Sequence, residues 1–187
     1  MGYPDMMRDI VEQARREAIT NRRKALENLP IIDRTTGLYN RVYFELRLDE
    51  EMARSRLYGN RLSLILIGTG LSGRQDQGNE NRISEKTTKV ISGIISNCLT
   101  DAIGLAFLYD QGKFAIILPE AGEQEAALIA DHIQKAILRE KMPGVKLHAG
   151  VVQYKDHESI DALIQAVDDA LYENINKGSS GSCVLLS

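Results

Sequence analysis

Two apolar runs joined by a short polar turn lie near the middle of this chain. The first run covers residues 103–109 and the second covers residues 114–118, with the polar residues 110–113 between them. Gly112 has no Cβ, so it can adopt the positive φ that a tight turn between strands needs. The stretch therefore predicts a β-hairpin with an exposed tip, and the other elements must join the sheet that this hairpin begins.

The hydrophobic pattern along the rest of the chain predicts helices alternating with strands. The expected elements are helices 6–28 and 40–57, strand 62–67, a helix ending near residue 98, the hairpin, helix 123–140, strand 145–152, helix 159–175 and strand 183–186. After the two leading helices the order begins as a ferredoxin-like split βαβ arrangement. We predict an α+β fold with a central mixed β-sheet of about five strands, flanked by helices, and an extra N-terminal helix.

Two of the predicted helices carry clear apolar stripes that indicate their buried faces. In helix 123–140 the residues expected to face inward are Ala127, Leu128, Ala130, Ile133, Ile137 and Leu138. In helix 159–175 they are Ile160, Leu163, Ile164, Val167, Leu171 and Ile175. Both stripes predict packing against the sheet.

A glycine-rich stretch follows the apolar strand 62–67. Residues 68–73 match the G-x-G-x-x-G dinucleotide fingerprint. That fingerprint needs a helix to open at once within a parallel βαβ unit, whereas residues 74–82 are polar and have no helical period. We predict an exposed loop over residues 68–82 instead of a dinucleotide site.

Composition and charge exclude several classes of protein. The 187 residues carry a net charge of −3, which gives no general attraction to nucleic acid or to anionic membranes. Cys98 and Cys183 fit neither a metal-binding spacing nor a disulfide framework, so reduced structural thiols are expected. No run approaches the roughly 20 apolar residues of a membrane span, and no apolar signal region is present. The sequence predicts a cytoplasmic domain that uses neither a membrane nor nucleic acid.

The N-terminal helix has a thin heptad pattern. Val11, Ala18 and Ala25 are seven residues apart, with Asn21 on the same seam. This pattern is typical of a coiled-coil arm that joins two copies, or of a linker from an upstream domain. A helix packed on its own domain remains the alternative. We predict a linker or coiled-coil-like helix over residues 1–30 and a second domain over residues 31–187.

Residues 33–41 predict a turn that leads into a helix. Gly37 permits the turn, and Asn40 can cap the helix that follows. Backbone N–H groups at a glycine turn before a helix also favour anions, so a phosphate contact is one interpretation and a structural cap is the other.

Four motifs in order give the chain a resemblance to the diguanylate cyclase (GGDEF) domain family, from about Asp33 to Val184. Residues 33–44 resemble the motif that opens the family's domain, with Thr35 where leucine is usual. Residues 114–119 are similar to the run that follows the signature, residues 149–152 to a serine-glycine-valine strand, and residues 167–172 to the closing helix. The resemblance implies a nucleotidyl-cyclase-like fold.

The signature itself departs from the family pattern. Its five positions are Asp110, Gln111, Gly112, Lys113 and Phe114, of which only the phenylalanine is retained. The resemblance places the family's metal-binding carboxylates at Gly68, Gly70 and Gly112. Magnesium prefers carboxylate oxygens, and two metals would be needed for phosphoryl chemistry. We therefore expect no metal, no cofactor and no cyclase activity.

The other ligand sites that the resemblance implies are also altered. The segment that holds base and phosphates corresponds to residues 71–78, where the pattern is broken. The family's inhibitory product site needs an arginine three residues before an aspartate, and neither Cys98 before Asp101 nor Asp101 before Gly104 supplies one. The residues that could still meet a phosphate are Thr36, Asn40, Arg41 and Lys113.

Together these features predict a catalytically inactive GGDEF domain that acts in cyclic di-GMP-related bacterial signalling as a protein-interaction or regulatory module. Its partner would be another signalling protein or an upstream domain, and a homodimer could form through the N-terminal helix. Nucleotide binding is not expected at the altered sites. The alternative is a non-catalytic receptor that binds GTP or cyclic di-GMP without turnover.

Overall fold

The computed structural model describes residues 13, 17, 30–71, 83–100, 103–155, 159–177 and 183–185. Contacts divide the chain into two units, Met1–Ile31 and Ile32–Ser187. In the first unit, Gln13 Nε2 donates a hydrogen bond to Glu17 Oε1 at 3.2 Å. The rest of the predicted helix 6–28, including its heptad pattern, lies outside the described residues.

The second unit contains the sheet and the helices that cover it. In chain order these elements are α2 (Arg41–Tyr58), β1 (Leu62–Leu71), α3 (Glu85–Cys98), β2 (Leu105–Asp110), β3 (Lys113–Pro119), α4 (Glu123–Arg139), β4 (Val145–Gln153), α5 (Ile160–Asn176) and β5 (Cys183–Leu185). This is the predicted order. Among the helices that the structure describes, none is both long and apolar enough to cross a lipid bilayer.

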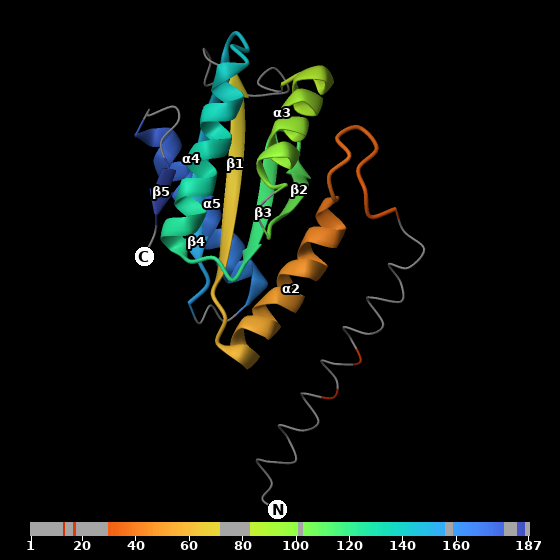
Figure 1. The fold of residues 1–187 in the computed structure, drawn as a ribbon, viewed down its shortest axis with the longest axis vertical. Helices are drawn as coiled ribbons and strands as arrows, with labels where there is room; N and C mark the ends of the chain where they lie inside the picture. The colour runs from red at the N-terminus through yellow and green to blue at the C-terminus, as the bar shows by residue number, and fades with distance from the viewer. Residues whose placement is uncertain are drawn as a thin grey trace, which may run out of the picture. The chain divides into compact units, whose positions relative to one another are not determined.

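The strands form one sheet in the order β2-β3-β1-β4-β5 (Figure 1). The central strand β1 pairs antiparallel with both β3 and β4, and β2 pairs antiparallel with β3. The short strand β5 pairs parallel with β4, so the sheet is mixed. The predicted α+β fold with a mixed five-stranded sheet is confirmed.

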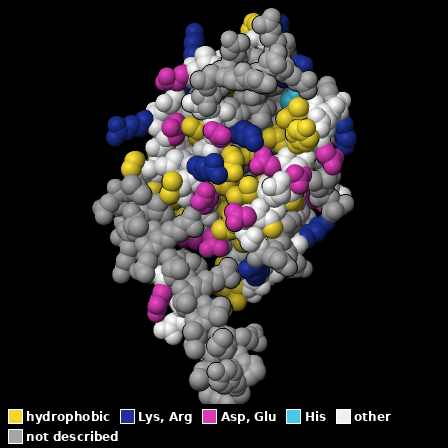
Figure 2. Space-filling view, turned by 180° about the vertical axis from the view of Figure 1, so that it is seen from behind, with side chains coloured by type: hydrophobic (Ala, Val, Ile, Leu, Met, Phe, Trp, Pro, Cys, Tyr) yellow, Lys and Arg dark blue, Asp and Glu magenta, His cyan; other side chains and the backbone are white. Residues whose placement is uncertain are grey.

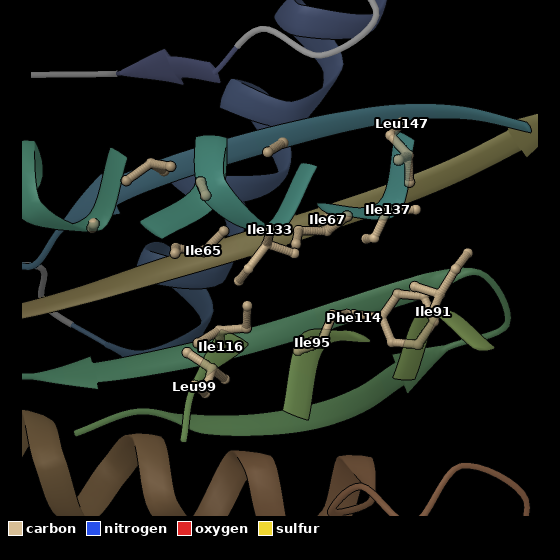
Figure 3. Close-up of a cluster of buried hydrophobic side chains, with 14 of the residues drawn as sticks. Ile65, Ile67, Ile91, Ile95, Leu99, Phe114, Ile116, Ile133, Ile137 and Leu147 are labelled. Carbon is tan, nitrogen blue, oxygen red and sulfur yellow. The ribbon is translucent and has the colours of Figure 1, made fainter. Parts of the chain in front are cut away.

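Helices cover both faces of this sheet, which explains why β1 is apolar along most of its length. On one face, α3 and α4 pack on Ile65, Ile67, Phe114 and Ile116 (Figures 1 and 3). On the other face, α2 and α5 pack on the alternate residues of the same strands, Leu62, Leu64, Leu66, Ala115 and Ile117. Successive side chains of a strand point to opposite faces, so a strand buried on both sides has no polar side to show.

The loop predicted over residues 68–82 is wrong in its first part. β1 continues to Leu71, with Gly68 opposite both Lys113 and His148, and Gly70 opposite Lys146. Pairing with both β3 and β4 at Gly68, and with β4 alone at Gly70, holds these residues in the sheet despite the weak strand propensity of glycine. Residues 72–82 lie outside the described part of the chain.

Part of the predicted inward face of α4 is also wrong. Leu128 is 71% exposed and Leu138 is 44% exposed, while Ala126 and Gln134 are fully buried. The buried stripe runs through Ala126, Ala130, Ile133, Gln134 and Ile137, and Leu128 lies off it, two residues before Ala130. In α5, Ile175 is 45% exposed although it lies four residues after the buried Leu171, because it stands one residue before the end of the helix.

Candidate functional site

The predicted hairpin is present, and it carries the five residues, 110–114, that were compared with the family signature. Gln111 and Gly112 join β2 to β3, with Asp110 opposite Lys113. Gly112 has φ +75°, as its role in the turn required. The Gln111 N–H donates to Asp110 Oδ1 at 2.7 Å, so this carboxylate closes the turn. Phe114, the retained signature residue, is fully buried in the core.

The tip of the hairpin is tied to the end of β1 at Gly112. Both the backbone N–H and the Oγ1 hydroxyl of Thr69 donate to the Gly112 carbonyl, each at 2.8 Å. A Cβ added to Gly112 would lie 2.7 Å from Thr69 Oγ1. The backbone geometry and the neighbouring hydroxyl therefore both oppose a side chain at this position.

Three residues form a row across the sheet beside the hairpin. Lys113 of β3, Gly68 of β1 and His148 of β4 are register partners. Successive side chains of a strand point to opposite faces of the sheet. By this alternation the three residues lie on the face that α2 and α5 cover. The row includes two of the signature-related positions, Gly68 and Lys113.

Helix α5 covers this row with three side chains spaced three residues apart. Lys113 Nζ lies 2.9 Å from Asp168 Oδ1, and a Cβ at Gly68 would lie 3.2 Å from Leu171 Cδ2. His148 Nδ1 and Asn174 Oδ1 are 3.0 Å apart, and both of these side chains are buried. An ion pair, an apolar contact and a hydrogen bond thus fill the space beside the row.

Arg41, predicted as a phosphate contact, lies over the ring of Tyr109, with its guanidinium carbon 4.6 Å from the ring centroid. Its Nε is 3.5 Å from Glu45 Oε1. Burial raises the pKa of the Tyr109 phenol, and Asp168 adds to this effect, whereas Arg41 and Lys113 oppose it. Figure 2 shows the face opposite to that of Figure 1, where charged side chains of both signs surround hydrophobic ones.

The other two predicted phosphate contacts have structural roles. Asn40 caps α2, because its side-chain oxygen accepts from the Tyr43 N–H at 3.0 Å. Thr36 belongs to the turn before α2, where its N–H and its hydroxyl both donate to Asp33 Oδ1 at 2.8 Å. The structure therefore places Arg41 over the Tyr109 ring and pairs Lys113 with Asp168, but leaves Thr36 in a separate turn.

A cavity of about 390 Å³ opens beside the hairpin tip, which we call the hairpin cavity. Its lining comes from the turn before α2, from the start of α3 and from the hairpin: Asp33, Thr35, Thr36, Ile83, Glu85, Thr88, Leu108 and Gln111. Asp33 and Glu85 supply two carboxylates, and the described lining contains neither Lys nor Arg.

Sequence reasoning missed the partners of the signature residues. Asp168 was visible in the closing-helix motif, but its pairing with Lys113 across 55 positions had no sequence signal. Glu85 and Thr88 looked like ordinary residues of a helix start. Within the described ranges, no group of three or more His, Cys, Asp or Glu side chains is placed to hold a metal ion.

The position compared with the inhibitory product site is packed against the core. A Cβ at Gly104 would lie 2.9 Å from Leu118 Cδ2 and 3.0 Å from Leu99 Cδ2. Asp101 lies outside the described residues. Burial raises the pKa of the Cys98 thiol, which suits the structural role predicted for it.

Comparison with known sequences gives a consistent result. The family described as "Diguanylate cyclase, GGDEF domain" matches residues 30–181. Diguanylate cyclase DgcM of Escherichia coli K12 is 26% identical over 176 residues, covering 92% of this chain and 41% of DgcM. Diguanylate cyclase DgcP of Pseudomonas aeruginosa is 25% identical over 148 residues, covering 76% of this chain and 22% of DgcP. The chain thus spans less than half the length of these relatives.

Solved structures share the fold. The GGDEF domain of DgcB from Caulobacter crescentus, in complex with c-di-GMP, has a TM-score of 0.69 at 18% identity, covering 83% of this chain and 92% of that one. Diguanylate cyclase SiaD from Pseudomonas aeruginosa, in complex with its activator SiaC, has a TM-score of 0.70 at 20% identity, covering 98% and 74%. With the family match over most of its length, this chain belongs to the diguanylate cyclase GGDEF domain family.

Proposed function

We propose that this GGDEF domain makes no cyclic di-GMP and acts in cyclic di-GMP signalling as a protein-interaction or regulatory module. The observation that carries the proposal is the filling of the altered metal positions. Gly68 and Gly112 stand where the family resemblance calls for carboxylates, and their space is taken by Leu171 and Thr69.

The residues at these positions do not fit a pair of divalent metal ions. Magnesium sites are built from carboxylate and other oxygen ligands, and glycine has no side chain to offer one. Lys113 adds a positive charge at the same edge, held 2.9 Å from Asp168. A fixed ammonium repels a metal cation, so it works against metal binding even where a backbone carbonyl is available.

Support for a role in protein binding comes from what the chain retains. The core, the sheet and the covering helices are those of the family, so the domain keeps a folded surface without its chemistry. SiaD, which has the same fold, is known in complex with its activator SiaC. An analogous role for this chain is therefore reasonable, with a signalling protein or an upstream domain as its partner.

The first 30 residues fit the same proposal as a linker or coiled-coil-like helix. They would connect the domain over residues 31–187 to an upstream module or to a second copy. Light scattering of the chain with and without residues 1–30 tests the second option, because a homodimer formed through this segment would become monomeric when it is removed.

A turnover assay tests the absence of cyclase activity. The purified chain is incubated with GTP and either Mg²⁺ or Mn²⁺, and cyclic di-GMP is measured by chromatography. We expect no product at any metal concentration, with an active GGDEF protein as the positive control. Metal-dependent formation of cyclic di-GMP would overturn the proposal.

A nucleotide receptor is the second candidate, because the hairpin cavity has the volume of a small-molecule site. The cavity is large enough for a small ligand and is lined by Thr36, one of the predicted phosphate contacts. A ligand that binds only the folded state at 100 times its dissociation constant stabilises that state by about 2.7 kcal/mol. Thermal unfolding with GTP or cyclic di-GMP therefore separates the candidates, since the interaction module should show no shift.

A further inference from the structure

We draw no further inference here: the strongest candidate, the pocket between the end of α2 and the end of β4 where Arg56, Arg61 and Lys155 come together, carries nothing, because each of these cations already contacts an aromatic or acidic side chain of the fold and no buried side chain that lacks a partner is directed into the pocket among the residues that the structure describes.

Discussion

Replacing Gly112 with alanine tests whether the third signature position can hold any side chain. The φ of +75° at Gly112 costs an L-residue about 1–2 kcal/mol. The new Cβ would also lie 2.7 Å from Thr69 Oγ1, and such overpacking costs about 1–3 kcal/mol more. We therefore expect Gly112→Ala to lower the free energy of unfolding by about 2–5 kcal/mol.

Gly144 provides a matched control. Its φ is +78°, but a Cβ there would have nothing within 4 Å, so Gly144→Ala should cost only the backbone part, about 1–2 kcal/mol. Urea denaturation followed by circular dichroism measures both values. In a Thr69→Ala background the cost of Gly112→Ala should fall to that of Gly144→Ala, because the close contact is gone.

Equal destabilisation by Gly112→Ala and Gly144→Ala, within about 0.5 kcal/mol, would refute the reasoning. It would mean that Thr69 moves aside without cost and that the hairpin tip can accept a side chain. The surrounding structure would then not be the reason that position 112 has no carboxylate.

Three further outcomes follow from the contacts around the signature. A double-mutant cycle of Lys113→Met and Asp168→Asn should give a coupling free energy of unfolding of about 0.5–1 kcal/mol. This coupling should fall with added salt, because both side chains are partly exposed. Zero coupling at low salt would contradict the ion pair. Burial raises the pKa of the Tyr109 phenol in the folded state. The neutral phenol therefore contributes to stability below pH 10.0, and this contribution is lost as the pH rises through the folded-state pKa. The free energy of unfolding of Tyr109→Phe should depend less on pH at alkaline pH than that of the unchanged chain. Gly68→Asp should destabilise the fold and give no cyclic di-GMP in the turnover assay, because the new side chain meets Leu171 and adds a negative charge to a covered position; product formation would show that one carboxylate is enough.

The sequence predicted the fold well because the elements have strong and distinct periods. Strand β1 is apolar on both faces, and the structure covers both faces with helices, as such a run requires. The errors arose where periodicity is ambiguous. Leu128 was assigned inward by its residue type, whereas its position on α4 points away from the sheet, leaving it 71% exposed.

Strand length was misjudged for a different reason. Gly68 and Gly70 suggested a loop, because glycine weakens a strand, but Gly68 pairs with both β3 and β4 and Gly70 pairs with β4, which keeps these residues extended. Such pairing joins residues that are distant in sequence, so local propensity could not predict it.

At the candidate site, the sequence supplied the identities of the residues but not their contacts. The identities of Gly112 and Lys113 sufficed to predict an altered signature, since a glycine and a cation cannot replace metal-binding carboxylates. What surrounds them could not be read. Neither the position of Thr69 over Gly112 nor the ion pair from Lys113 to Asp168 follows from any spacing, because each depends on how separate elements pack.

These contacts determine what a metal site at this edge would require. A carboxylate at Gly68 meets Leu171, one at Gly112 meets Thr69, and Lys113 would still bring its charge to the same edge. Each of these changes alone is therefore expected to cost stability and to gain no metal, because a two-metal site needs several carboxylates together. Residues in contact are expected to couple in this way, so that the effect of one change depends on the others. A metal site at this edge would therefore require changes in β1, the hairpin and α5 at once, because Leu171, Thr69 and Lys113 each stand against it.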